Sequence, residues 1–334
     1  MNIVVLAGGY SSERDVSFVS GASIANALTR KSHKVILVDS FMGIDTVKPT
    51  FEDNYKNLAK SKYEYTIPKT EIDLSKLDNN TNNLIGKNTI ELCKQADVVF
   101  NALHGGIGED GRLPALLDIY NIKYTGTGYL GSIVSMDKLL SKQVMDSYNI
   151  LSAPWAIWDG ENKMGYPCVV KPANGGSSCG VSIARNQKEL QLAIEYAAGY
   201  EKRIVIEKYI KGREFSCGVL GDRALPAIEI IPKAEFFDYE SKYQTGGAQE
   251  ICPADIPKHL DKTMQEIALK VHKKLELGTY SRSDFIVDEK GDVYCLEANS
   301  LPGMTPASLL PKEAKAVGIE YDDLCEMIVK LALE

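Results

Sequence analysis

The stretch NIVVLAGGYSSERDVSFVSGASIANALTRKSHKVILVD (residues 2–39) decides the class of fold. Residues 2–7 are a continuous apolar run that stops at two glycines, which is typical of a buried parallel strand. Residues 12–15 fit a capping box, and the apolar side chains after them recur at helical spacing. Residues 34–39 have the pattern of a second strand. The order strand, loop, helix, strand predicts that the protein begins with an α/β sheet.

Beyond this unit the pattern changes along the chain. Residues 43–94 are polar and rich in Lys, Asn and Asp, so we expect an elaborated and partly irregular region there. A strand at 97–102 returns to the sheet, a domain boundary is expected near residue 128, and strand pairs dominate after residue 212. The remaining expected elements are helices at 136–148, 187–198, 258–276 and 320–333, and strands at 167–171, 203–207, 214–220, 224–231, 280–288 and 292–298.

Composition narrows the classes of protein. A chain of 334 residues fits two or three lobes of about 100–150 residues each. The net charge of −7 comes without a basic block, which argues against a nucleic-acid surface. The seven cysteines are scattered and never spaced as CxxC, which favours reduced thiols in the cytosol over disulfides or zinc. The N-terminus lacks signal-peptide features and no run reaches ~20 apolar residues, so we expect a cytoplasmic protein without membrane segments.

Two loops have features of a nucleotide site. GGSSCGV (175–181) follows a strand that ends near Lys171, and its glycine amides, serine hydroxyls and the lysine charge would cradle phosphate. The alternative is a flexible hairpin loop, and the Walker pattern is absent. EKYIKGRE (207–214) begins at the end of an apolar strand, where Glu207 and Glu214 could meet the amino group and ribose of a purine nucleotide. A charged surface turn is an equally good interpretation of this segment alone.

The segment RSDFIVDEKGDVYCLEANSLPGMT (282–305) carries the strongest local signal. It predicts two antiparallel strands, and a hairpin can bring Asp284 opposite Glu297 and Asn299, which share one face of the second strand. Three oxygen ligands among apolar neighbours would be costly to bury without a cation, and hard oxygen ligands select Mg²⁺ or Mn²⁺. The alternative is a solvent-facing acidic hairpin.

The first strands deliver two further candidates. Glu13 follows the two glycines after the first strand, and LHGGIGEDG (103–111) follows another strand, so both loops should lie at the carboxyl edge of the sheet, where such sheets bind ligands. His104 is as readily structural as functional. A dinucleotide site is disfavoured because GxGxxG is missing after the first strand. Residues 233–250 include several aromatic side chains that could pack over the site and a Gly246-Gly247 pair that could act as a hinge. This segment is therefore a candidate for a lid that closes over the site.

Taken together, these motifs resemble the D-alanine–D-alanine ligases of the ATP-grasp superfamily. The resemblance spans essentially the whole chain in the family's order, and its motifs are LAGGYSSERDVS (6–17), LHGGIGEDG (103–111), SMDK (135–138), VVKPANGGSSCGV (169–181), IEKYIKGREFS (206–216), FFDYESKY (236–243), SRSDF (281–285) and EANSLPGMTPASL (297–309). It implies an ATP-grasp fold, α/β with an α+β C-terminal part, and three domains: a Rossmann-like one at 1–127, a central one at 128–210 and a C-terminal one at 211–334. It also implies a homodimer.

The resemblance assigns expected roles to individual residues. Glu13 would receive the ammonium of the first D-alanine, Ser177 and Tyr243 would join it in a triad that fixes a closing loop, and His104 would line the first subsite. Arg282 and the backbone of Gly303 would stabilise the tetrahedral oxyanion. The remaining expected groups hold the second alanine's carboxylate (Lys242, Ser308, Leu309), the nucleotide (Lys138, Lys171, Glu207, Lys208, Ile210, Glu214) and two Mg²⁺ or Mn²⁺ ions (Asp284, Glu297, Asn299).

The expected reaction is ATP-dependent joining of two D-alanines through an acyl phosphate, for peptidoglycan precursors. Two departures bear on local geometry: the family usually has Gln near Pro114 and an apolar residue at Ser283. The first alternative is a related ligase that takes D-serine or D-lactate second. A non-catalytic nucleotide-binding regulator is the second alternative, but it should lack some metal ligands or the oxyanion arginine, and this chain has them all.

Overall fold

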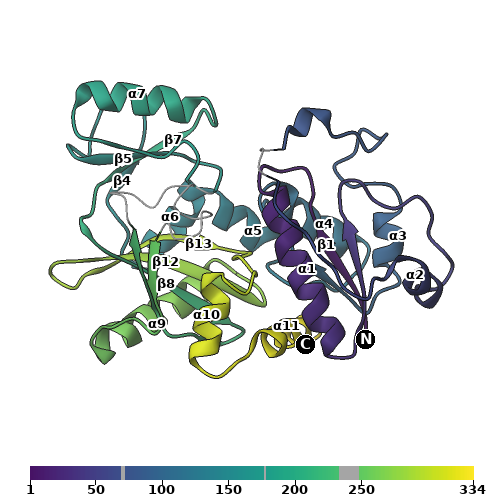
Figure 1. Cartoon of the computed structure of the whole chain (residues 1–334). Helices are drawn as coiled ribbons and strands as arrows, with labels where there is room; N and C mark the ends of the chain where they lie inside the picture. Colours follow the sequence, from purple (N-terminus) through teal and green to yellow (C-terminus); the bar gives the residue numbers. More distant parts are fainter. Residues whose placement is uncertain (69–71, 177, 233–247) are drawn as a thin grey trace.

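The computed structural model describes residues 1–68, 72–176, 178–232 and 248–334, and these residues form three β-sheets flanked by helices (Figure 1). The first sheet is parallel and the other two are antiparallel. The mixed α/β class expected from the sequence is therefore confirmed, with the antiparallel part towards the C-terminus.

The first sheet has the order β2-β1-β3, from β1 (Asn2–Ala7), β2 (Lys34–Asp39) and β3 (Val98–Asn101). Its apolar strands are buried because α1 (Arg14–Arg30) and α4 (Arg112–Ile119) pack beside them. The predicted capping box is wrong: α1 begins after Glu13, whose side chain makes no capping hydrogen bond. Instead, the Ser11 hydroxyl accepts a hydrogen bond from the Glu13 amide at 3.2 Å.

The polar region 43–94 is largely irregular, as predicted, in its described residues. It contains only short helices: α2 (Phe51–Leu58), the 3₁₀ turn η1 (Leu74–Lys76) and α3 (Thr89–Cys93). Side-chain amides replace regular backbone pairing here; the buried Asn79, for example, donates to the carbonyl of Phe41 at 2.8 Å.

The second sheet has the order β4-β7-β5-β6, from β4 (Trp155–Ile157), β5 (Cys168–Pro172), β6 (Ser182–Ala184) and β7 (Ile204–Lys208), with α7 (Gln187–Ala198) packed on it. Two helices precede it, α5 (Tyr129–Met136) and α6 (Lys138–Ser147). The helix predicted at 136–148 begins instead at Lys138, because Asp137 caps it by accepting from the amides of residues 139 and 140.

The third sheet has the order β11-β10-β8-β12-β13, with β9 paired to β8 at one end. Its strands are β8 (Gly212–Leu220), β9 (Arg223–Ala224), β10 (Ile228–Pro232), β11 (Ala248–Ile251), β12 (Tyr280–Asp288) and β13 (Val293–Asn299). The helix α9 (Lys258–Lys274) covers one face, and Phe215, Met264 and Phe285 are fully buried between them.

The C-terminal helices return to the first sheet. After α10 (Leu309–Ala316), α11 (Tyr321–Leu331) lies along α1, close to both chain termini (Figure 1). Leu324 and Ile328 share a buried cluster with Ile24 and Leu28 of α1. At the edge of this contact, Arg30 forms an ion pair with Asp322 at 2.6 Å. The first and third sheets are therefore joined by one continuous apolar core.

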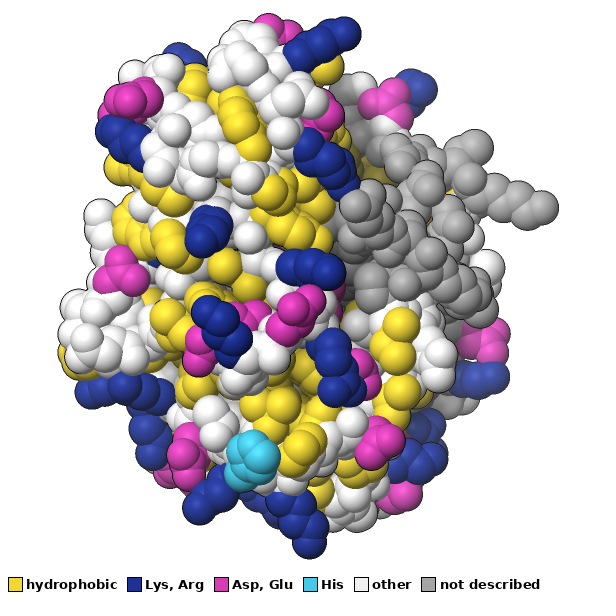
Figure 2. Space-filling view, turned by 90° about the vertical axis from the view of Figure 1, so that its left-hand side faces the viewer, with side chains coloured by type: hydrophobic (Ala, Val, Ile, Leu, Met, Phe, Trp, Pro, Cys, Tyr) yellow, Lys and Arg dark blue, Asp and Glu magenta, His cyan; other side chains and the backbone are white. Residues whose placement is uncertain are grey.

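The surface has mixed charge. On the face shown in Figure 2, Lys and Arg side chains alternate with Asp and Glu and form no continuous basic patch. All seven cysteines are free thiols. None of the helices in the described part of the chain is long and apolar enough to cross a membrane.

Candidate active site

The carboxyl edge of the first sheet brings Glu13 and His104 together. His104 is buried, its Nε2 lies 3.0 Å from the Ser20 hydroxyl on α1, and burial lowers the pKa of its imidazole. The Ser11 hydroxyl donates to the carbonyl of His104 at 2.7 Å. The next residue, Gly105, has φ +66°, and a Cβ there would lie 2.9 Å from a carboxylate oxygen of Glu13. The loop after β3 therefore passes directly over Glu13.

Glu109 completes this edge and was not among the predicted site residues. Its carboxylate accepts the amide of Gly105 at 3.0 Å. Burial, together with the negative charge of Glu13, raises the pKa of Glu109 to about 8, although the positive charge of Arg282 opposes the shift. The sequence signal was present, since Glu109 lies in the glycine-rich loop after β3.

An arginine fixes the glycine loop after β1. Gly8 and Gly9 have φ of +73° and +79°, and a Cβ on Gly8 would lie 2.6 Å from the Phe18 ring. The buried Arg14 donates to the carbonyl of Gly9 at 2.6 Å and forms an ion pair with Asp39. The start of α1, which Glu13 directly precedes, is therefore held to both strands.

The hairpin of β12 and β13 gathers the three predicted oxygen ligands. Asp284 pairs with Glu297 in the strand register, and the Asn299 amide donates to Asp284 at 3.0 Å. Arg282 donates twice to Asp284, at 2.9 Å each, and the pKa of Arg282 is raised because these contacts outweigh the effect of its burial. This donor set of two carboxylates and one amide oxygen fits a hard divalent cation. No cluster of three or more His, Cys, Asp or Glu side chains is placed to bind a metal in the described ranges, and the hairpin reaches three oxygen ligands only by including Asn299.

Two lysines meet at Glu207 near the second sheet, and a third, Lys138, reaches the predicted phosphate loop. Lys138 at the start of α6 donates to the carbonyl of Gly175 at 2.5 Å, so it touches the predicted phosphate loop. Glu207, only 1% exposed at the end of β7, lies 3.1 Å from the Lys171 ammonium and 3.2 Å from that of Lys142. Burial opposes the ionisation of Glu207, but the two lysines hold its pKa below the usual value. Lys142 was not predicted from the sequence.

The other predicted nucleotide residues lie where β7 passes into β8. Lys208 is exposed at the end of β7, and Ile210 is half-buried in the connection. Glu214, half-buried on β8, adds to the negative charges that raise the pKa of the Lys171 ammonium against its burial. The structure therefore groups Glu214 with Lys171 and Glu207, on the border of two sheets.

The loop after β13 lies before α10. The Ser308 hydroxyl accepts the Thr305 amide at 3.1 Å, and a Cβ on Gly303 would lie 2.9 Å from that hydroxyl. Leu309 is the first residue of α10. Of the two departures from the family pattern, Pro114 lies in the first turn of α4, where proline is tolerated. Ser283 is fully buried in β12, and its hydroxyl has no hydrogen-bond partner among the described residues.

Three predicted site residues lie outside the described residues: Ser177, Lys242 and Tyr243. The same holds for most of the predicted lid and for its proposed hinge at Gly246-Gly247; residues 248–250 belong to β11.

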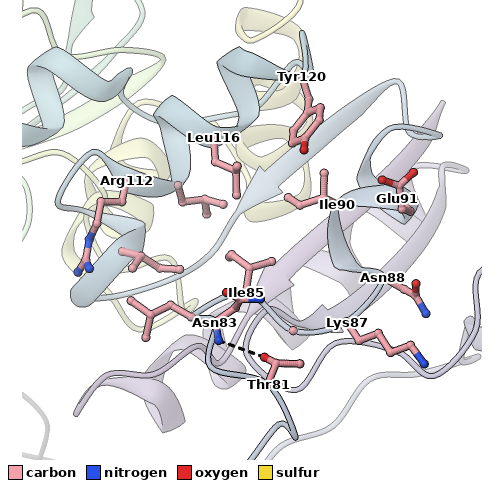
Figure 3. A pocket seen from close by; sticks show the side chains of 14 residues that line it. Thr81, Asn83, Ile85, Lys87, Asn88, Ile90, Glu91, Arg112, Leu116 and Tyr120 are labelled. Atoms are coloured by element: carbon pink, nitrogen blue, oxygen red, sulfur yellow. Dashed lines mark hydrogen bonds between the residues drawn. The ribbon is translucent and has the colours of Figure 1, made fainter.

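A separate surface hollow of about 640 Å³ lies between α4 and residues 81–91 (Figure 3). Leu116 and Tyr120 line one side and Ile85 and Ile90 the other. None of the described residues that line it is a predicted site residue, so the hollow is not the candidate active site.

Comparisons with known proteins agree with this arrangement. Residues 2–127 match the family described as D-ala D-ala ligase N-terminus, and residues 150–330 match D-ala D-ala ligase C-terminus. The D-alanine–D-alanine ligase of Pediococcus pentosaceus is 42% identical, with 98% of this chain and 97% of that protein covered. That of Lacticaseibacillus casei is 40% identical, with 98% and 95% covered. A crystal structure of the Bacillus anthracis D-alanine–D-alanine ligase complexed with ATP has a TM-score of 0.76 at 31% identity and covers 100% of this chain and 97% of its own. This chain belongs to the D-alanine–D-alanine ligase family.

Proposed function

We propose that this chain joins two D-alanines to D-alanyl-D-alanine for peptidoglycan synthesis, converting ATP to ADP and phosphate. The single observation that carries the proposal is the approach of the β12–β13 hairpin to the first sheet. Tyr280 of β12 shares a buried cluster with Val5 of β1 and Phe100 of β3. In keeping with this packing, the positive charge of Arg282 helps to lower the pKa of His104 and opposes the rise in the pKa of Glu109. A site for a small amino acid therefore adjoins the candidate metal ligands, and the reaction is that of the family.

The first step is an attack by the carboxylate of one D-alanine on the γ-phosphorus of ATP, which gives D-alanyl phosphate and ADP. Glu13 would bind the ammonium of this alanine, and His104 would line its subsite. Lys138 and Lys171 would hold the phosphates, with Lys171 exchanging its contact to Glu207 for the nucleotide. Asp284, Glu297 and Asn299 would hold Mg²⁺ or Mn²⁺, which when bound neutralises charge on the phosphoryl group.

The second step is an attack by the amine of the other D-alanine on the acyl carbon. The amine loses a proton, the peptide bond forms and phosphate leaves. Arg282 and the amide of Gly303 would stabilise the tetrahedral oxyanion. Ser308 and Leu309, at the start of α10, would face the carboxylate of this second alanine together with Lys242.

Water must be kept out, because it would hydrolyse the acyl phosphate. Ser177 and Tyr243 would join Glu13 in the triad that closes the site, and residues 233–250 would form the lid. Glu207, Lys208, Ile210 and Glu214 would hold the adenine and ribose, at the border between the second and third sheets.

Each of the three proposed domains, 1–127, 128–210 and 211–334, contains one of the three sheets, which supports this division. We also propose that the protein is a homodimer in the cytoplasm. Light scattering of the purified chain tests the dimer directly: twice the mass of 36.7 kDa is expected, and that of a single chain would contradict it.

Phosphate release with different acceptors tests the function. The purified chain is given ATP, Mg²⁺ and D-alanine alone, or D-alanine with D-serine or D-lactate, and products are identified by mass. Efficient D-alanyl-D-alanine formation is expected, with L-alanine as the inactive control. Preferential formation of the D-alanyl-D-serine product or of the depsipeptide would favour the alternative, a ligase with a different second substrate.

A further inference from the structure

Lys142 is the most deeply buried cation of the nucleotide region. The residue is 1% exposed, and its ammonium lies 3.2 Å from Oε1 of Glu207, while Lys171 contacts the other carboxylate oxygen. Lys142 follows Lys138 by four residues on α6, so both project from one face of this helix. The helix lies between the second and third sheets (Figure 1).

The two lysines differ in their access to solvent. The side chain of Lys142 is 2% exposed, whereas that of Lys171 is 14% exposed, and the negative charges of Glu297 and Glu214 help to raise the pKa of Lys171. Lys171 can therefore turn towards phosphates at the hairpin. Glu207 is the only carboxylate among the described residues with which Lys142 forms an ion pair.

A buried carboxylate without a cation is expensive, so the position of Glu207 depends on its partners. With both lysines present, the cluster carries one excess positive charge. When Lys171 moves to the phosphates, Lys142 alone remains to keep Glu207 charged and in place.

We infer that Lys142 is a positioning residue for nucleotide binding: it holds Glu207 fixed and ionised while Lys171 is released to the phosphates. This rests on the proposed function, which places ATP between the second and third sheets. Lys142 itself touches neither the reacting atoms nor the amino acids, so its loss should weaken nucleotide binding and leave the amino-acid sites intact.

The test compares Lys142→Met, Lys142→Arg and Glu207→Gln, with Lys211→Met as a control on an exposed lysine. ADP affinity is measured by titration calorimetry in Mg²⁺, and KM is measured separately for ATP and for D-alanine. Lys142→Met should weaken ADP binding and raise the KM for ATP by about tenfold each, with the KM for D-alanine within twofold of wild type. Lys142→Arg should recover most of the loss, and Lys211→Met should change nothing.

The double variant Lys142→Met with Glu207→Gln removes both charges and remains informative should Lys142→Met fail to fold. Because Lys142 acts through Glu207, the double variant should bind ADP as Glu207→Gln does. A further tenfold loss in the double variant would overturn the inference. So would a Lys142→Met protein with a lower melting temperature and unchanged ADP affinity. If the proposed function is wrong, the result differs: the wild type binds ADP but makes no D-alanyl-D-alanine.

Discussion

The burial of Glu313 leads us to expect that the stability of the fold falls as the pH rises above about 5. It lies on α10 with no exposed surface, and one carboxyl oxygen accepts the amide of Gly218 at 2.7 Å. The other oxygen has no hydrogen-bond partner among the described residues. Burial raises the pKa of Glu313 from 4.5 to about 8, with Asp284 adding to the shift and Arg282 opposing it.

The sign and size of the change in stability follow from the different proton affinities of Glu313 in the folded and unfolded chains. Below pH 4.5 the carboxyl is protonated in both states, so it costs nothing. Between pH 4.5 and about 8 the unfolded chain has lost the proton and the folded chain still binds it, so stability falls as the pH rises. At ~1.4 kcal/mol per pH unit, the loss between pH 5 and pH 7 is about 2–3 kcal/mol. Glu313→Gln keeps an acceptor for Gly218 but cannot titrate, so it should escape this loss.

Denaturant unfolding at pH 5, 6, 7 and 8 measures the effect, with Glu289→Gln as the control because that side chain is 81% exposed. The free energy of unfolding of Glu313→Gln relative to wild type should rise by about 2–3 kcal/mol between pH 5 and pH 7. The control should differ from wild type by the same amount at every pH. A constant difference for Glu313→Gln would refute the reasoning, because it would mean that Glu313 titrates alike in both states.

Three further predictions concern the site and the fold. Glu297→Gln should reduce ATP turnover at least ~100-fold with an unchanged circular dichroism spectrum, because a metal ligand is lost; normal turnover would remove Glu297 from the metal site. Gly105→Ala should raise the KM for D-alanine about tenfold, because its Cβ would press on Glu13 and φ is +66°; steady-state kinetics with an unchanged KM would contradict this placement of the loop. Arg30→Ala should lower the free energy of unfolding by less than ~1 kcal/mol in denaturant titrations, because its pair with Asp322 is at the surface; a larger loss would show that this pair anchors α11.

The sequence predicted the regular elements best where apolar runs end at glycines or polar turns. β1, β2, β12 and α7 have the predicted bounds. The short helices α2, α3, α4, α5 and α10 were missed, because eight residues or fewer leave little room for a repeating pattern. The start of α1 was misplaced because tertiary contacts of Arg14 fix the preceding loop.

The site residues likewise divide into those that a local sequence pattern predicts and those that only tertiary packing determines. Asp284, Glu297 and Asn299 could be grouped from sequence because strand periodicity and a hairpin turn determine which side chains share a face. Lys142 and Glu313 could not be found this way. Each looks like an ordinary charged residue of an amphipathic helix, and only the packing of distant strands buries it. Burial of charge is a tertiary property, which a linear pattern does not encode.

The return of α11 to α1 has a mechanical consequence. The first and third sheets share one apolar core, whereas the second sheet packs around its own small cluster with α7. Bending between the first and third sheets would expose that common core to water, whereas tilting the second sheet would not. We therefore expect the second sheet to tilt relative to the first and third sheets when nucleotide enters and leaves. The first and third sheets would not move relative to each other, so the amino-acid pocket would keep its shape throughout the cycle.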